Sequence, residues 1–233
     1  MQAVILAGGK GTRLRPYTTV FPKPLMPIGD YPILEVVIRQ LRKHGFRKLT
    51  LAVGHMHELF RAFFNEGEKW DVKIEYSLED KPLGTAGPLR RIQGLEDDFL
   101  MMNGDILTDL NFGELMAFHK DHGGPATIVT HHREVKIDYG ALEFDGDGVL
   151  RKYTEKPTLS YDVSMGIYCL SRRAVDLIPE DSYFDFPSLM NAIMASGQKV
   201  ICRPYSGYWL DIGRPDDYEQ AIQDFEKMEK NLL

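Results

Sequence analysis

The stretch that decides the fold reads Leu6-Ala7-Gly8-Gly9-Lys10-Gly11-Thr12-Arg13-Leu14-Arg15-Pro16. It follows an apolar run over residues 3–6, which predicts a buried strand. The glycines allow backbone N–H groups to come close to a ligand, and the basic side chains of Lys10, Arg13 and Arg15 stand among them. We therefore expect a turn that leaves the strand and binds an anion, and a polyphosphate suits it best.

Two well-known phosphate loops do not fit this stretch. A P-loop needs a lysine followed directly by serine or threonine, but Gly11 separates Lys10 from Thr12. The dinucleotide fingerprint needs a third glycine at the position of Leu14. A glycine-rich turn without function remains as an alternative, and the basic residues that follow at once make it the weaker one.

A second loop places one lysine between two prolines. Pro22 and Pro24 restrict the backbone on either side of Lys23, so the loop is a rigid support for a single positive charge. An ordinary exposed turn lysine is the alternative.

These two loops together carry a family resemblance. Gly8-Gly9-x-Gly11-Thr12-Arg13-Leu14 followed by Pro22-Lys23-Pro24 resembles the signature of the sugar-1-phosphate nucleotidylyltransferases, also called nucleotide-sugar pyrophosphorylases, and is most similar to the mannose-1-phosphate guanylyltransferases. The resemblance extends from residue 1 to about Tyr218. It implies that Arg13 and Lys23 are catalytic. It also implies that the nucleotide is bound by Leu6, Ala7, Gly8, Gly9, Gly11 and Thr12.

Two further segments match nucleotide and metal positions of the family. Leu83-Gly84-Thr85-Ala86-Gly87 corresponds to the family's loop that lies against the nucleotide base. The resemblance therefore adds Glu79, Gly84 and Thr85 to the nucleotide-binding residues. A helix that begins here with Thr85 as its cap would explain the same sequence. A buried strand ends at Asn103-Gly104-Asp105, where a carboxylate is well placed to bind magnesium, although a single aspartate there is often only a turn residue. The resemblance assigns Asn103 to the nucleotide and Asp105 to Mg²⁺. Asp211, in a Trp-x-Asp-x-Gly segment, matches the second metal ligand.

The sugar-phosphate segment is Glu155-Lys156-Pro157. In the family, the glutamate accepts hydrogen bonds from sugar hydroxyls and the lysine meets the phosphate, with a glycine upstream that corresponds to Gly140. The resemblance also assigns Ser164 to the sugar-phosphate site, although many relatives have asparagine at this position. The identity of the sugar is therefore left open.

Apolar segments alternate between strand and helix character along the chain. Helices are expected over residues 32–44, 57–64, 111–122, 172–178, 187–195 and 215–230, with a further one toward residue 92, and strands over residues 3–6, 49–53, 72–76, 99–105, 126–130 and 200–203. Residues 139–157 are rich in hairpin turns. The pattern predicts an α/β fold, Rossmann-like, with a mixed, mainly parallel sheet and helices on both faces. Ligands of such sheets bind at the carboxyl ends of the strands.

Length and composition limit the remaining possibilities. With 233 residues, 43% of them hydrophobic, we expect a single catalytic domain over residues 1–233, without the C-terminal β-helix of many longer relatives. A net charge of -6 argues against a nucleic-acid partner, and no apolar run is long enough for a membrane. Cys169 and Cys202 lie in apolar segments, which favours buried free thiols and a cytoplasmic protein. The last helix could dock on the domain or support a homodimer.

The expected reaction needs positioned charges rather than a covalent catalyst. A phosphate oxygen of a sugar 1-phosphate attacks the α-phosphorus of a nucleoside triphosphate with Mg²⁺ bound, giving a nucleotide sugar and pyrophosphate. Two other classes stay open. A glycosyltransferase would use a DxD motif, which Asp145-Gly146-Asp147 spells within an expected hairpin turn, and a non-catalytic nucleotide-sugar sensor would be expected to lack Lys23 or an aspartate.

Glu79 is the residue from which we predict the nucleobase of the substrate. Guanine offers two adjacent donors, N1–H and N2–H₂, to which a carboxylate is complementary, whereas uracil and thymine suit a glutamine. We therefore expect GTP and mannose 1-phosphate as substrates. A uridylyl- or thymidylyltransferase acting on glucose 1-phosphate is the alternative, and so is a solvated Glu79 with the base held by backbone groups alone.

Overall fold

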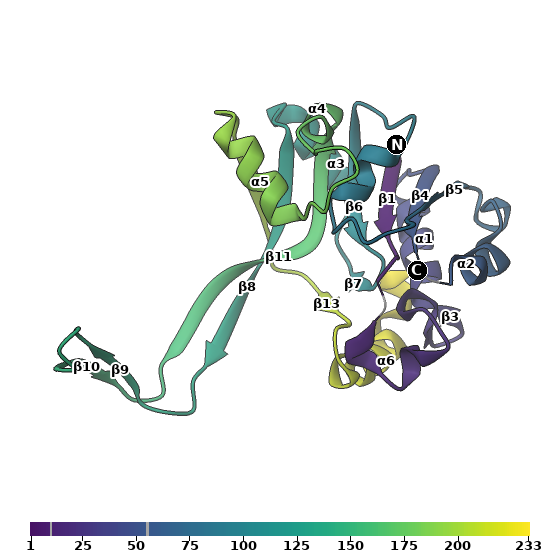
Figure 1. Ribbon diagram of the computed structural model, residues 1–233. Coiled ribbons are helices and arrows are strands. Elements are labelled where there is room, and N and C mark those ends of the chain that lie inside the picture. Colours follow the sequence, from purple (N-terminus) through teal and green to yellow (C-terminus); the bar gives the residue numbers. More distant parts are fainter. Residues whose placement is uncertain (10, 55) are drawn as a thin grey trace.

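A seven-stranded sheet forms the centre of the computed structural model, which describes residues 1–9, 11–54 and 56–233 (Figure 1). In spatial order its strands are β12 (Val200–Tyr205), β8 (Ala126–Lys136), β11 (Thr158–Ser171), β6 (Asp98–Asn103), β1 (Gln2–Leu6), β4 (Lys48–Val53) and β5 (Lys73–Leu78). Neighbouring strands run parallel, except that β11 is antiparallel to both β6 and β8. The predicted mixed, mainly parallel sheet is confirmed.

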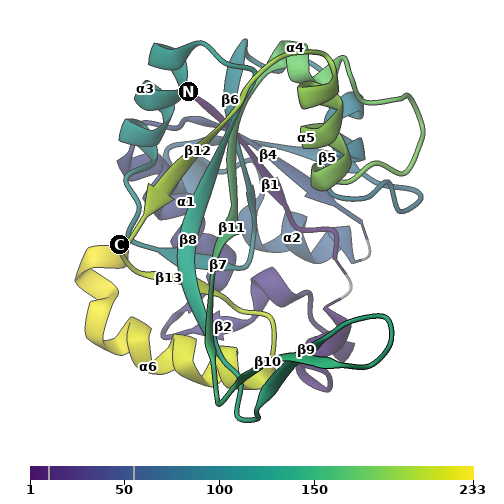
Figure 2. The ribbon, with the colours of Figure 1, turned by 90° about the vertical axis from the view of Figure 1, so that its left-hand side faces the viewer.

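Helices cover both faces of this sheet, as Figure 2 shows. Alternation along β1 explains why: Ala3 and Ile5 belong to one hydrophobic cluster and Val4 to another, since successive side chains of a strand point to opposite faces. The first cluster contains residues of α1 (Ile33–Lys43), α2 (His57–Phe64) and α3 (Phe112–His122). The second contains residues of α4 (Arg172–Val175) and α5 (Phe186–Ala195). Both faces are therefore buried, which explains why the central strands are mainly apolar.

The last helix, α6 (Pro215–Leu232), docks on the domain. Its buried residues include Tyr218 and Phe225, which pack in a third cluster with Leu14 and Ile28 from the N-terminal loops. The Tyr218 hydroxyl also donates a hydrogen bond to the Pro27 carbonyl, at 2.6 Å. This helix therefore supports the loops that follow β1.

The remaining elements are short. They are the strand pairs β2 (Pro27–Ile28) with β3 (Tyr31–Pro32) and β7 (Ile106–Thr108) with β13 (Trp209–Asp211), and the 3-10 helices η1 (Thr12–Leu14), η2 (Tyr17–Thr19), η3 (Lys23–Leu25), η4 (Glu68–Trp70) and η5 (Gly87–Arg91). The helix expected toward residue 92 is therefore only η5, with Pro88 in its first turn. Across the described residues, none of the helices has the length and apolar character needed to cross a membrane.

One expectation about the cysteines is wrong. Cys169 is buried in β11, but Cys202 is exposed because β12 is an edge strand of the sheet, and both are free. An apolar neighbourhood in sequence did not distinguish a central strand from an edge strand.

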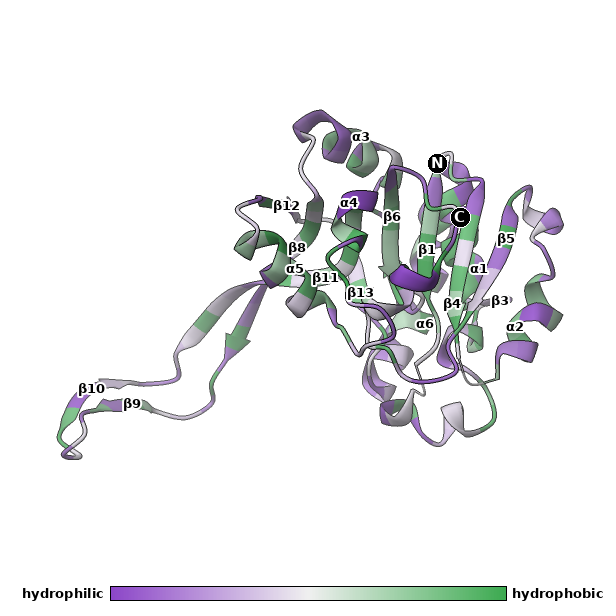
Figure 3. Cartoon of the chain, turned by 45° about the horizontal axis from the view of Figure 1, so that its top comes forward, coloured by the Kyte–Doolittle hydropathy of each residue, from purple (hydrophilic) through white to green (hydrophobic). Residues whose placement is uncertain are grey.

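An extension of two strands leaves the body of the molecule. Beyond His131, where β8 loses its pairing with β12, β8 and β11 continue as a two-stranded ladder from Asp162↔His132 to Thr158↔Lys136. A hairpin of β9 (Ala141–Phe144) and β10 (Leu150–Thr154) forms its tip. We call residues 132–162 the arm. Figures 1 and 3 show that it projects far from the rest of the chain.

Candidate active site

A cavity of about 860 Å³ lies at the carboxyl ends of β1 and β6, beside β4 and β5. Arg13, Lys23 and Asp105 line this cavity. So do all ten residues that we expected to bind the nucleotide, namely Leu6, Ala7, Gly8, Gly9, Gly11, Thr12, Glu79, Gly84, Thr85 and Asn103. Asp211 does not line the cavity, but its Oδ1 lies 4.0 Å from Nζ of Lys23, which does. Lys10 lies outside the described residues. The cavity thus gathers loops from several distant parts of the chain at the edge of the sheet that the fold predicts.

The glycines of the first loop differ in what a side chain at each position would meet. Gly11 has φ +59°, and a Cβ there would stand 3.0 Å from a methyl carbon of Thr18, whose hydroxyl donates to the Gly11 carbonyl at 2.7 Å. A Cβ at Gly8 would stand 3.0 Å from a carboxylate oxygen of Glu79. At Gly9 no described atom lies within 4 Å of the added carbon, so this glycine borders open cavity space. The loop is packed on one side and open to a ligand on the other.

Lys23 is the central charge of the site. It is 7% exposed, lies on η3, forms an ion pair with Asp105, and its Nζ is 4.0 Å from Asp211 Oδ1. The two aspartates are brought together by the β7–β13 pairing, which sets Asp211 opposite Ile106, and by the Ile212 N–H that donates to the Asp105 carbonyl at 3.2 Å. Sequence-distant carboxylates therefore meet at one ammonium group.

The electrostatic surroundings of Asp105 and Asp211 suit the binding of a cation. Burial and the negative charge of Asp105 raise the pKa of Asp211, against the lowering effect of Lys23 and Arg13. Asp105 Oδ1 is buried and has no hydrogen-bond partner among the described residues. Repelling carboxylates with a free oxygen suit a hard divalent ion. The described residues contain no cluster of three or more His, Cys, Asp or Glu side chains, and two carboxylates are the set typical of Mg²⁺, which takes its other ligands from phosphates and water.

Arg13 lies beside Gly213, a residue of the cavity wall that was not among the expected site residues. A Cβ at Gly213 would stand 3.6 Å from a guanidinium nitrogen of Arg13, and Gly213 lines the cavity. The final glycine of the Trp-x-Asp-x-Gly segment was the available signal. Gly213 and Arg13 therefore lie next to each other in the cavity wall.

Glu79 begins the loop that closes the cavity on the side of β5. Its N–H donates to the Val53 carbonyl at 2.9 Å, and its carboxylate accepts from the Leu83 N–H at 3.5 Å. Burial raises the pKa of the Glu79 carboxyl, opposed by that backbone hydrogen bond and by Arg91. Glu79 is therefore a half-buried acid at the cavity wall, not a fully solvated one.

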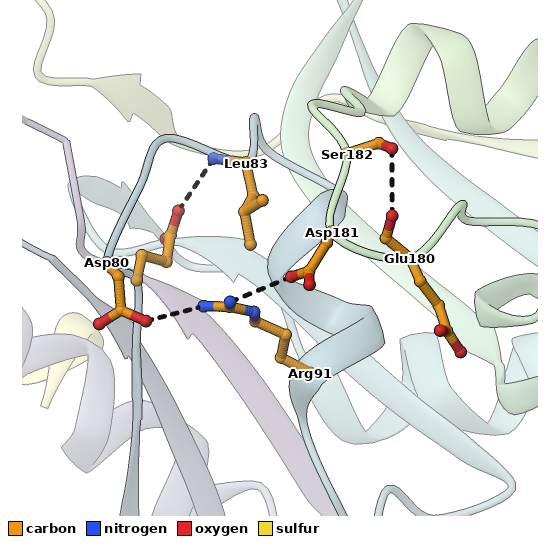
Figure 4. Close-up of polar contacts among 7 residues, drawn as sticks. Asp80, Leu83, Arg91, Glu180, Asp181 and Ser182 are labelled. Carbon is orange, nitrogen blue, oxygen red and sulfur yellow. Dashed lines mark hydrogen bonds and ion pairs between the residues drawn. The ribbon is translucent and has the colours of Figure 1, made fainter.

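Arg91 ties this loop to a segment far along the chain. Its guanidinium lies 3.4 Å from Asp80 and 3.0 Å from Asp181, which Figure 4 shows on opposite sides of the arginine. The loop over residues 180–185 supplies Tyr183, which is 68% exposed and lines the cavity. Nothing in the local sequence singled out this tyrosine, because its loop reaches the site only through the tertiary fold.

The Leu-Gly-Thr-Ala-Gly segment is held against the same distant loop. Gly84 has φ +81°, and a Cβ there would stand 2.5 Å from the Phe184 carbonyl oxygen, which accepts from the N–H groups of Ala86 and Gly87. The Thr85 hydroxyl oxygen accepts from the Phe186 N–H at 3.0 Å. Thr85 therefore contacts the start of α5 and does not cap a helix of its own segment.

Comparison with known proteins places this site in a family. Residues 2–228 match the family model described as nucleotidyl transferase. The chain belongs to the nucleotidyl transferase family. This agrees with the resemblance carried by the glycine-rich and Pro-Lys-Pro loops, and curated relatives are named as sugar-1-phosphate nucleotidylyltransferases.

Two curated relatives of this nucleotidyl transferase chain differ in their named substrates. UTP–glucose-1-phosphate uridylyltransferase of Synechocystis is 35% identical, with 96% of this chain and 63% of the relative covered. The mannose-1-phosphate guanylyltransferase catalytic subunit beta of Dictyostelium discoideum is also 35% identical, with 94% and 62% covered. The chain thus spans less than two thirds of the length of these relatives.

A solved structure shares the whole fold of this nucleotidyl transferase. HddC from Yersinia pseudotuberculosis superposes with a TM-score of 0.74 at 25% identity, and the match covers 96% of this chain and 99% of HddC. The same protein has been solved in complex with GMP-PN. The nucleotide-diphospho-sugar transferase type of fold is therefore confirmed.

The base of the arm adjoins the cavity. Gly166, at a bulge of β11 with φ +72°, leaves space for Asn103, whose Nδ2 would stand 2.7 Å from an added Cβ. Ser164 donates a hydrogen bond to the Tyr168 hydroxyl at 2.9 Å and accepts one from the Gly166 N–H. Ser164 does not line the cavity. It shapes the bulge next to a residue that does.

The other sugar-phosphate candidates are separated from the cavity. Gly140, Glu155 and Lys156 lie on the arm, which Figure 1 shows away from the body. None of them lines the cavity. Glu155 instead accepts a hydrogen bond from the Tyr153 hydroxyl at 3.1 Å. Within one chain of this nucleotidyl transferase, the structure therefore brings together the predicted nucleotide and metal residues but not the predicted sugar-phosphate residues.

Proposed function

We propose that this chain transfers a nucleoside monophosphate from a nucleoside triphosphate to a sugar 1-phosphate. The observation that carries the proposal is the buried Lys23, which lies near both Asp105 and Asp211 in the wall of a glycine-lined cavity. A phosphate oxygen of the sugar 1-phosphate forms a bond to the α-phosphorus, the bond from that phosphorus to its leaving oxygen breaks, and pyrophosphate departs. The nucleophile is already an anion at neutral pH, so the reaction needs no general base.

Each charged residue then has a role. Lys23 and Arg13 neutralise phosphate oxygens as negative charge gathers between nucleophile and leaving group. Asp105 and Asp211 would hold Mg²⁺, which supplies further charge neutralisation and orients the phosphates when bound. The unpartnered Asp105 Oδ1 supports this assignment. The glycine-rich loop presents backbone N–H groups to the triphosphate.

Guanine is the base that Glu79 favours. A half-buried carboxylate on the cavity wall can accept both N1–H and N2–H₂ of guanine, and it offers no donor to uracil or thymine. The guanylyltransferase named among the relatives and the HddC complex with GMP-PN support GTP. Mannose 1-phosphate is supported by the name of the guanylyltransferase alone. The Synechocystis relative supports the alternative, UTP with glucose 1-phosphate.

The competing classes have less support. Asp145 accepts hydrogen bonds from the backbone N–H groups of Asp147, at 3.1 Å, and Val149, at 3.0 Å, so the DxD spelling belongs to the turn at the tip of the arm. A sensor without catalysis would have no need of Lys23 together with both aspartates. We further propose that residues 1–233 form a single catalytic domain.

The experiment is pyrophosphate release with a panel of triphosphates and sugar 1-phosphates in the presence of Mg²⁺. GTP with mannose 1-phosphate is expected to be the best pair. If pyrophosphate were released faster with UTP or dTTP than with GTP, the guanine assignment would be wrong and the proposed reaction class would stand. If no pair of substrates released pyrophosphate, the proposed reaction class would be refuted. Lys73→Ala is a matched control for Lys23→Ala, because Lys73 is an exposed lysine of β5 that pairs with Glu75.

A further inference from the structure

Tyr183 places an aromatic ring in the wall of the cavity. Among the described residues that line the cavity it is the one aromatic, and it is 68% exposed. The two other aromatic residues of its segment pack toward the interior: Phe186 is buried in the second hydrophobic cluster, and Phe184 is packed against that cluster. Tyr183 is therefore the aromatic of this loop that is left for a ligand.

Tyr183 lies on the same side of the cavity as Glu79. The Phe184 N–H donates a hydrogen bond to the Leu83 carbonyl at 2.8 Å, and the Leu83 N–H donates to the Glu79 carboxylate at 3.5 Å. Gly84 lies so close to this segment that an added Cβ would stand 2.5 Å from the Phe184 carbonyl oxygen. The ring is therefore linked through Leu83 to the carboxylate that we assign to the base.

A carboxylate and an aromatic ring contact different parts of a nucleobase. The carboxylate accepts from donors on the edge of the base, in the plane of its ring. An aromatic side chain instead stacks on the flat face, which every base has. Gly8, Gly9 and Gly54 line the cavity with backbone only, so they offer no ring for such a contact. A base whose edge meets Glu79 therefore has a face free for Tyr183.

The loop that carries Tyr183 is held on both sides of the tyrosine. After it, Phe184 is fixed by hydrogen bonds of its backbone. Before it, the Arg91 guanidinium joins Asp181, at 3.0 Å, to Asp80, at 3.4 Å, and Asp80 belongs to the loop of the base carboxylate (Figure 4). Asp181 has φ +53°, which a non-glycine residue keeps only where its surroundings select it. Exposed ion pairs add little stability, so the bridge matters for where it places the loop.

We propose that Tyr183 stacks on the face of the purine base whose edge Glu79 binds, and that the Arg91 bridge positions this tyrosine. The inference rests on the proposed function. Tyr183 then contributes contact area rather than donors and acceptors, so it strengthens the binding of every nucleoside triphosphate. A purine gains more than a pyrimidine, because its face is larger. Glu79 selects guanine by its edge, and Tyr183 holds the selected base in place.

Nucleotide binding without a sugar 1-phosphate tests the ring directly, because no transfer can occur. In calorimetric titrations with Mg²⁺ present, Tyr183→Ala should weaken GTP binding about ten-fold or more, and UTP binding less. Tyr183→Phe keeps the ring and should bind GTP as the wild type does. So should the control Met194→Ala, which removes an exposed apolar side chain of α5 outside the cavity wall. Wild-type GTP affinity in Tyr183→Ala, or a rise only in the KM of the sugar 1-phosphate, would overturn the proposal.

A spectroscopic measurement distinguishes stacking from a nearby but separate ring. With 3-fluorotyrosine in place of Tyr183, GTP should move the ¹⁹F resonance upfield, because the ring current of a stacked purine shields nuclei above its face. Inorganic tripolyphosphate, which can occupy the phosphate loop without a base, should not produce this shift. An equal shift with both ligands, or none with saturating GTP, would contradict stacking.

A double-mutant cycle tests the positioning role of Arg91. Because Arg91 acts through Tyr183, Arg91→Ala should weaken GTP binding in the wild-type chain but cause no further loss in the Tyr183→Ala chain. Arg91 also lowers the pKa of Glu79, and an effect by that route would persist in the Tyr183→Ala chain. Equal losses in both chains would therefore refute the positioning role.

Arg90→Ala is the matched control for Arg91→Ala. Arg90 is the neighbouring arginine of η5, and it pairs instead with Asp176 and Glu180, so its loss should leave GTP affinity close to that of the wild type. An equal loss of affinity from both changes would contradict a specific role of the Arg91 bridge. If all these binding results hold and the wild-type protein releases no pyrophosphate with any sugar 1-phosphate, the proposed function alone is refuted.

Discussion

Replacing Lys23 by alanine should reduce turnover far more than stability. Loss of one charge contact made in the transition state lowers the rate by about 10²- to 10³-fold, or about 3 to 4 kcal/mol. The cost in folding free energy is smaller. Asp105, whose side chain is 21% exposed, and Asp211, at 46%, both reach solvent when the ammonium is removed, so the loss should be about 1 to 3 kcal/mol.

A second substitution at the same position separates charge from packing. Lys23→Met keeps most of the aliphatic stem that lies buried on η3 and deletes only the ammonium group. Its unfolding midpoint in denaturant should stay closer to wild type than that of Lys23→Ala, while its turnover should fall equally. Steady-state pyrophosphate release and urea unfolding measure the two quantities. A folded Lys23→Met protein with near-normal kcat would refute the role of the charge.

Four further outcomes follow from the site. Asp105→Asn or Asp211→Asn should abolish Mg²⁺-dependent turnover and weaken Mg²⁺ binding by calorimetry; unchanged metal binding in both would contradict the shared site. Glu79→Gln should lower the preference for GTP over UTP about ten-fold or more, because a mispaired buried donor costs about 1 to 3 kcal/mol, as competition between the two nucleotides would measure. Burial raises the pKa of Glu79, so this carboxylate becomes protonated at a higher pH than an ordinary glutamate does. The preference of the wild type for GTP should therefore decline on acidification already at that higher pH. A pH profile of the preference identical to that of Glu79→Gln would contradict this. Gly84→Ala should destabilise the fold, since φ is +81° and the Phe184 carbonyl would stand 2.5 Å from the new carbon, and a wild-type thermal midpoint would contradict that steric argument.

The central sheet and its nucleotide edge could be predicted because local patterns and tertiary packing agree there. Continuous apolar strands such as β1 and β6 are buried on both faces, and the helix of residues 57–64 is found over that same range. The glycine-rich loop, the Pro-Lys-Pro loop and the Gly-Asp strand end each follow directly from such elements. Their convergence on one cavity then follows from the parallel order of the strands.

Other features depend on contacts that leave no local pattern. Residues 132–136 continue β8 as exposed and partly charged positions, so only the mostly buried part over residues 126–130 was expected as a strand. Tyr183 reaches the cavity through the Arg91 bridge to Asp181, and Cys202 is exposed only because β12 is at an edge. Edge position and long-range docking are properties of the assembled sheet, and one strand's composition does not encode them.

The reaction itself is tested most directly by the fate of oxygen. Mannose 1-phosphate labelled with ¹⁸O in its phosphate oxygens is incubated with GTP, Mg²⁺ and wild-type protein, and both products are analysed by mass spectrometry. Because a sugar-phosphate oxygen attacks the α-phosphorus, all label should remain in the nucleotide sugar, with one labelled oxygen bridging its two phosphorus atoms, and the pyrophosphate should be unlabelled. Label in the pyrophosphate, or pyrophosphate released without a nucleotide sugar, would contradict the account.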